Sequence, residues 1–254
     1  MIIQKPDILI KILSFLLALN LSNIQESNKI LEKLRELNFQ PFPEFSKEAL
    51  YFRFPDIDKW KRSEGPIKIG IQVGHWILEE PPLELNKISK TGAVLGILKE
   101  VDINYLIGKE VAKILENKGY KVDLLPAVLP ESYYADAFVS LHTNSTDSKV
   151  SGFMISTPFV DYSGKAFKLK ESIIQEYSKA TGFNFIDEFT QNMTHYYSFN
   201  WSRYKNTIHP KTPAVILEMG NMKNQKDLLF LILGYQKVAE GIANGIENFI
   251  KENY

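Results

Sequence analysis

The chain has 254 residues, of which 44% are apolar, with 30 basic and 30 acidic side chains and a formal net charge of zero. This balance gives no field that would attract nucleic acid or an anionic membrane surface, so we expect no nucleic-acid partner. The absence of cysteine excludes disulfides, thiolate metal sites and cysteine nucleophiles, so any metal must be held by histidines and carboxylates.

We expect residues 1–65 to form a helical N-terminal appendage. The segment 8–21 (ILIKILSFLLALNL) is the most apolar in the chain, but it is short for a membrane span, which needs roughly 20 residues. It is interpreted as a helix packed on the main domain, with membrane association or a weak export signal as the alternatives. Apolar residues at helical spacing predict a second, amphipathic helix over 23–37. The appendage could anchor the protein, direct export or lie across a cleft as an autoinhibitory helix.

From residue 66 to residue 254 the apolar pattern alternates between strand and helix. Strands are predicted at 67–73, 121–125, 137–141, 152–156 and 214–217, and helices at 101–118, 165–180 and 225–251. This alternation predicts a single α/β domain: a mixed, mainly parallel sheet flanked by helices on both faces.

Three of the predicted strands are followed by an ionisable side chain. They lead to His75, His142 and Glu218, while Glu100 lies at the start of the helix over 101–118. The carboxyl ends of parallel strands meet at one edge of a sheet, so all four side chains can gather there. Two histidines and a carboxylate are a usual ligand set for catalytic zinc with a position open for water, and a second carboxylate could act as the base.

Each of these residues also has a purely structural interpretation. A histidine at a strand end is often only a satisfied polar group. Glu100 is favourable at a helix start through the helix dipole alone, and Glu218 could pair with a basic residue in the core. The other two histidines are weaker candidate ligands. His209 precedes the strand at 214–217 and should lie at its opposite end, and His195 lies in an aromatic segment.

Three further residues are candidates for substrate contact. The aromatic segment 193–204 (MTHYYSFNWSRY) contains Tyr197 and Trp201, and aromatic rings interleaved with amides suit contact with a sugar or a peptide. Asn144 follows His142 closely and could donate a hydrogen bond at the cleft. Packing for the aromatic residues and loop capping for Asn144 are the alternatives.

Four segments, taken together and in this order, resemble the type 3 zinc-dependent N-acetylmuramoyl-L-alanine amidases. They are VGHW (73–76), GAVLGILKEVDINYLIGKEVAKILENKGYKV (92–122), ADAFVSLHTNS (135–145) and TPAVILEMGNMKNQKD (212–227). The resemblance implies a hydrolase that cuts the amide bond between N-acetylmuramic acid and L-alanine in peptidoglycan, outside the cytoplasm at the cell envelope. It implies Zn²⁺ as the cofactor, with His75, Glu100 and His142 as ligands and Glu218 as the catalytic carboxylate. Two alternatives are a non-catalytic peptidoglycan-binding module with the same fold and a zinc peptidase or deacylase acting on another amide.

The chain departs from the family pattern near the proposed cleft. The family usually has Asp-Pro-Gly-His-Gly-Gly where this chain has Gln72-Val73-Gly74-His75-Trp76. Trp76 and the segment 79–87 add bulk, an arginine of the family is missing from 126–137, and Asn221 stands where a phenylalanine is common. Metal binding is still expected with these changes, but the preferred substrate does not follow from the resemblance.

Overall fold

The computed structural model describes residues 47–188 and 190–254, without the side chain of Glu48. The chain divides into two compact units, residues 1–55 and 56–254. Helix α3 (Lys47–Arg53) belongs to the first unit, and the whole central sheet belongs to the second. The predicted helices over 8–21 and 23–37 lie outside the described residues.

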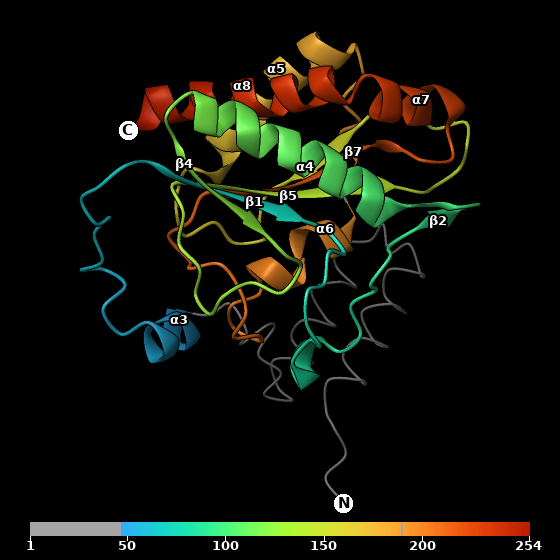
Figure 1. Cartoon of the computed structure of the whole chain (residues 1–254). Coiled ribbons are helices and arrows are strands. Elements are labelled where there is room, and N and C mark those ends of the chain that lie inside the picture. The colour runs from blue at the N-terminus through green and yellow to red at the C-terminus, as the bar shows by residue number, and fades with distance from the viewer. Residues whose placement is uncertain (1–46, 189) are drawn as a thin grey trace, which may run out of the picture. The chain divides into compact units, whose positions relative to one another are not determined.

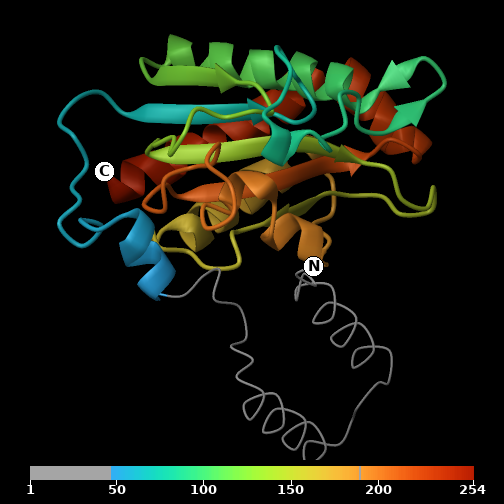
Figure 2. The same cartoon turned by 90° about the horizontal axis from the view of Figure 1, so that it is seen from below.

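The second unit is built on a five-stranded sheet with the order β4-β1-β5-β7-β6 (Figures 1 and 2). The strands are β1 (Lys68–Val73), β4 (Lys121–Leu125), β5 (Ala137–Asn144), β6 (Met154–Ser156) and β7 (Ala214–Asn221). Only the edge strand β6 runs antiparallel to its neighbour. A separate antiparallel hairpin, β2 (Val94–Leu95) and β3 (Leu98–Lys99), precedes the first long helix.

The two faces of the sheet are covered unequally. The long helices α4 (Glu100–Asn117), α5 (Ala166–Thr181) and α8 (Tyr235–Asn253) lie on one face, and α7 (Gln225–Leu233) joins them (Figure 1). The other face carries the short helix α6 (Gln191–Thr194), the 3-10 turn η3 (Tyr197–Phe199) and loops. A further 3-10 turn, η2, covers Leu83–Leu85.

The central strands explain this layering, because both of their faces are buried. In β5, Val139 and Leu141 pack into the core cluster on the helix side. Phe138, one position away from Val139, packs into the cluster on the loop side. Side chains alternate along a strand, so a strand covered on both faces reads as a nearly continuous apolar run.

The predicted fold class, a mixed and mainly parallel sheet flanked by helices, is confirmed. The long helices lie on one face and the short α6 on the other, and the remaining differences lie in element lengths. The strand predicted at 137–141 continues through His142 to Asn144, and the strand predicted at 214–217 continues through Glu218 to Asn221. The backbones of the two strands stay paired beyond these points, where polar side chains replace the apolar ones. The apolar pattern therefore stops before the strand does. The helical region 225–251 is two helices separated by Gly234.

The segment before β1 belongs to the same compact unit as the sheet, which begins at Asp56. Arg62 donates from Nε to Asp136 Oδ1 at 2.6 Å and from Nη2 to Oδ2 at 2.9 Å. Asp136 also accepts the backbone N–H of Lys68 at 2.9 Å, so one carboxylate joins the segment, β1 and the start of β5.

Candidate metal centre

Two of the predicted site residues are side-by-side neighbours in the sheet. His142 in β5 and Glu218 in β7 are register partners. The preceding pair, Leu141 and Leu217, packs into the helix-side core, so His142 and Glu218 point to the opposite face. The strand register therefore presents an imidazole and a carboxylate together near the carboxyl edge of the sheet.

His75 follows the end of β1 in an uncommon backbone conformation. Its φ of 67° lies in the left-handed region, which a non-glycine residue rarely adopts. Its Nδ1 is 2.9 Å from the carbonyl oxygen of Ser89, so that nitrogen carries the proton and Nε2 keeps its lone pair. Nε2 lies 3.2 Å from Glu100 Oε1. A Cβ added at Gly74 would run into the imidazole of His142, so only glycine permits this approach.

Glu100 is the first residue of α4, and its side chain is buried. Oε2 accepts the N–H of Ala93 at 2.9 Å. Oε1 accepts the N–H of Thr143 at 3.2 Å and the Nδ2 of Asn104 at 3.3 Å. Gly92 has a φ of +65°, and a Cβ there would collide with the Glu100 carboxylate. Backbone and amide donors therefore hold the carboxylate in one orientation.

Together the three residues form a compact donor cluster. One ligand atom from each of His75, Glu100 and His142 lies within 4.8 Å of the others. His142 Nδ1 is 2.9 Å from Glu100 Oε1. Burial works to raise the pKa of Glu100, but its contacts with His142 and His75 hold that pKa well below its ordinary value. Burial lowers the pKa of His142, which favours the neutral imidazole that a metal requires.

Glu218 differs from Glu100 in the hydrogen bonding of its carboxyl oxygens. Its Oε2 is buried and has no hydrogen-bond partner in the described part of the chain. Burial, together with the negative charge of Glu100, raises the pKa of Glu218 to about 8, and His75 opposes this shift. A buried carboxyl group with a pKa near neutral can exchange a proton at physiological pH.

The other predicted residues lie in different settings. Asn144 is two positions beyond His142, and its Oδ1 accepts the N–H of Ser145 at 2.7 Å. Tyr197 donates to the carbonyl of Ala127 at 2.6 Å. Trp201 is only 2% exposed, so its ring packs inside the protein rather than facing a substrate.

Neither of the remaining histidines belongs to the donor cluster of His75, Glu100 and His142. His195 stacks on Phe159 with ring centroids 4.7 Å apart. His209 stacks on Trp60 at 5.1 Å, and burial lowers its pKa to about 4. Asn221, one of the departures from the family pattern, donates to the carbonyls of Asp147 and Val150 and so holds a loop in place.

The sequence analysis did not identify two residues that support the cluster, Asn104 and Tyr196. Asn104 is fully buried and bridges Glu100 and the carbonyl of Gly74, and its Oδ1 accepts from Thr143 Oγ1 at 2.9 Å. Its position one helical turn after Glu100 is a signal that could have identified it. Tyr196 lies 3.0 Å from His142 Nε2 and comes from a segment far along the chain.

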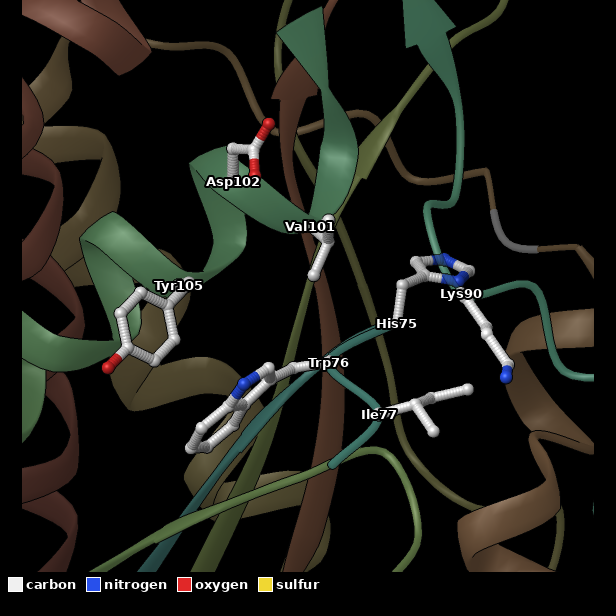
Figure 3. A pocket seen from close by; sticks show the side chains of 7 residues that line it. All are labelled: His75, Trp76, Ile77, Lys90, Val101, Asp102 and Tyr105. Atoms are coloured by element: carbon white, nitrogen blue, oxygen red, sulfur yellow. The ribbon is translucent and has the colours of Figure 1, made fainter. Parts of the chain in front are cut away.

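A pocket of about 390 Å³ opens beside His75 (Figure 3). Trp76 and Tyr105 form one side, with ring centroids 5.0 Å apart, and His75 and Lys90 lie on the other (Figure 3). Asp102 is the acidic residue of the lining. The pocket therefore combines an aromatic wall with charges of both signs next to the metal-ligand cluster.

Comparison with known proteins identifies the class. The family N-acetylmuramoyl-L-alanine amidase matches residues 69–248, which is more than half of the chain. The chain belongs to this family and is an enzyme of this class, as the sequence analysis predicted. None of the curated proteins compared with the chain matches it.

Solved structures share the fold at low sequence identity. The CwlD amidase from Clostridioides difficile, solved in complex with the GerS lipoprotein, is 21% identical with a TM-score of 0.52, over 74% of this chain and 100% of that one. The amidase Ami1 from Mycobacterium smegmatis is 17% identical with a TM-score of 0.54, over 74% and 98%. AmiC2 of Nostoc punctiforme is 22% identical with a TM-score of 0.50, over 74% and 99%.

Family membership supports amidase action on peptidoglycan, which agrees with a location outside the cytoplasm. Within residues 47–188 and 190–254, no helix is both long and apolar enough to cross a membrane. The predicted membrane association through 8–21 lies outside that range.

Proposed function

We propose that this chain is a zinc-dependent amidase that cuts the bond between N-acetylmuramic acid and L-alanine. In this proposal His75, Glu100 and His142 hold the metal and Glu218 is the catalytic carboxylate. The observation that carries the proposal is the buried, unpartnered Oε2 of Glu218 on the strand beside His142. A buried acceptor without a donor costs free energy, and catalysis is a reason to retain it.

The donor set fits zinc. Two imidazoles and one carboxylate leave one coordination position open, which is typical of catalytic rather than structural zinc. His75 is held through Nδ1 by the carbonyl of Ser89, so Nε2 is the nitrogen free to bind metal. Glu100 is oriented by Ala93, Thr143 and Asn104. Such outer contacts fix ligand geometry and tune the affinity for the ion.

The reaction assigns separate tasks to the two carboxylates. When bound, zinc polarises the scissile carbonyl and makes water a stronger acid and nucleophile. Glu218 takes the proton from the attacking water at its unpartnered Oε2 and delivers it to the departing amide nitrogen, which leaves as the amino group of L-alanine. Glu100 stays ionised because its contacts with His142 and His75 hold its pKa low.

The pocket beside His75 supplies a place for substrate. The wall made by Trp76 and Tyr105 can contact the apolar face of a sugar ring or a peptide side chain, and Lys90 and Asp102 can pair with charges of the substrate. Asn144 remains a proposed substrate contact at the end of β5. Because peptidoglycan lies outside the cytoplasm, the proposal places the enzyme at the cell envelope, with residues 1–65 as its appendage.

The test compares the wild-type chain with Glu218→Gln and His142→Ala. Zinc content is measured by elemental analysis, and new amino termini released from purified peptidoglycan are labelled and identified. We expect zinc and new L-alanine termini in the wild type, zinc without product in Glu218→Gln, and loss of zinc in His142→Ala.

Other outcomes would contradict defined parts of the proposal. A wild-type protein that binds peptidoglycan but contains no zinc and releases no termini would be a non-catalytic binding module. Termini other than L-alanine would indicate a zinc peptidase or deacylase. Unchanged zinc in His142→Ala would remove that residue from the ligand set.

A further inference from the structure

The nitrogen of His142 that faces away from Glu100 meets a pair of tyrosines. His142 Nε2 lies 3.0 Å from the hydroxyl of Tyr196, and the Tyr196 ring meets the imidazole edge-on with centroids 5.3 Å apart. The Tyr196 hydroxyl lies 3.0 Å from that of Tyr197, which in turn lies 2.6 Å from the carbonyl oxygen of Ala127. Three hydrogen bonds therefore connect the imidazole to a backbone carbonyl.

The carbonyl at the end of this chain fixes its direction. A carbonyl oxygen only accepts, so Tyr197 gives its single hydroxyl proton to Ala127. The oxygen of Tyr197 can then only accept, and it accepts from Tyr196. Tyr196 has thereby used its own proton, so its oxygen must accept from His142. The Nε2 of His142 carries the hydrogen.

The contacts of Gln72 support the same donor-to-acceptor direction, from His142 to Ala127. This buried amide donates from Nε2 to the carbonyl of Ala127 at 2.9 Å and approaches the hydroxyl of Tyr197 at 3.4 Å. Its orientation is held by Ser198, which donates from Oγ to the Gln72 Oε1 at 3.2 Å. An amide N–H cannot accept the proton of Tyr197. An aspartate at this position would instead compete with Ala127 for that proton.

We propose that Tyr196 and Tyr197 are positioning residues that keep His142 protonated at Nε2 and turn the lone pair of Nδ1 to the metal. Nδ1 is the nitrogen that lies 2.9 Å from Glu100 Oε1, inside the donor cluster. The inference rests on the proposed zinc site and deepens it. The sequence analysis predicts that Tyr197 contacts substrate, whereas this proposal gives Tyr197 a role in orienting His142.

The first test measures zinc affinity with the metal alone, by competition with a chromophoric chelator on the full chain. Tyr197→Phe leaves Tyr196 without its acceptor and frees the Tyr196 proton to bond His142 Nε2, which places the imidazole hydrogen on Nδ1 against the metal. We expect Tyr197→Phe and Tyr196→Phe to weaken zinc binding by about tenfold or more, the range known for contacts behind a ligand.

Tyr177→Phe is the matched control. Tyr177 is fully buried and donates to the carbonyl of Met219 at 2.6 Å, but it packs in the helix-side core. Its loss should lower stability without changing zinc affinity. Equal zinc affinity in Tyr197→Phe and the wild type would overturn the proposal, as would an equal loss in all three variants.

A second measurement needs no variant. Long-range ¹H–¹⁵N spectra of the zinc-loaded wild type identify which nitrogen of His142 carries the hydrogen. A hydrogen on Nε2 supports the proposal, and a hydrogen on Nδ1 overturns it while leaving the zinc site intact. A wild type that binds no zinc would contradict the proposed function, and this inference with it.

Discussion

His142 and Glu218 are register partners on the adjacent parallel strands β5 and β7, and both face away from the helix layer. This pairing places a proposed metal ligand next to a proposed base, and both residues lie within strands and not in loops. A one-residue slip of either strand would turn its side chain to the helix side. The register of the buried sheet therefore fixes the position of the proposed base relative to the proposed ligand.

Replacing Glu218 by glutamine should separate metal binding from turnover. The amide keeps the size of the side chain but cannot take a proton from water, so the rate of amide hydrolysis should fall by about 10² to 10⁴-fold with zinc content unchanged. Release of L-alanine termini and zinc content are measured on the same preparation. Glu116→Gln, an exposed substitution on α4, serves as the control. Activity in Glu218→Gln within tenfold of the wild type would exclude a role as the base.

The same substitution should stabilise the protein when zinc is removed by a chelator. The folded-state pKa of Glu218 is about 8, above the unfolded value of about 4.3, so folding favours its protonated form. The wild type then loses stability as pH rises between these values, by at most about 1.4 kcal/mol per pH unit from this group. Glutamine has no such dependence.

We therefore expect zinc-free Glu218→Gln to match the wild type near pH 4 and to exceed it increasingly toward pH 8. Urea unfolding across this range measures the difference. Two curves that stay parallel at every pH would show that burial does not shift this carboxyl group.

The fold class and the candidate site residues could be predicted from the sequence because both predictions depend on local patterns. Apolar runs identified β5 and β7, and the polar residue after each run identified His142 and Glu218. Parallel topology then required those ends to meet. The helix start likewise identified Glu100, which is the first residue of α4.

Long-range contacts explain what the sequence could not predict. Tyr196 reaches His142 from a segment 54 positions away. Trp201 was expected to contact substrate, but nothing local distinguishes it from Trp76, which is partly exposed and lines the pocket. Tertiary packing alone decides which aromatic side chain is buried. The continuation of β5 and β7 past their apolar runs has the same origin, because strand pairing depends on the neighbouring backbone.

Removing Asn104 should lower the zinc affinity, because Asn104 contacts the proposed ligand Glu100. Asn104 donates to Glu100 Oε1 and to the carbonyl of Gly74, so Asn104→Ala removes one of the donors that orient the Glu100 carboxylate and leaves buried polar groups unpaired. We expect zinc affinity to fall about 10 to 100-fold and the free energy of unfolding to fall by about 1–3 kcal/mol. Chelator competition and urea unfolding measure the two effects.

Asn244→Ala on α8 is the control for Asn104→Ala. Asn244 accepts a hydrogen bond from Lys118 at 3.0 Å, and neither residue belongs to the metal-ligand cluster. Its removal should leave zinc affinity unchanged. A stable Asn104→Ala protein with wild-type zinc affinity would show that Ala93 and Thr143 orient Glu100 without help.

Trp76 tests whether the pocket beside His75 binds substrate. The ring lies 5.0 Å from that of Tyr105, and together they form one wall of the pocket. Trp76→Ala should remove contact with the bound substrate without touching the zinc ligands, so KM should rise by roughly tenfold while kcat and zinc content stay the same. Steady-state kinetics on soluble muropeptides measure the two constants separately.

Phe167→Ala, which removes a ring that is 64% exposed on α5, should leave both constants unchanged. If kcat falls instead of KM rising, Trp76 contributes to the transition state and not to uniform binding of the substrate.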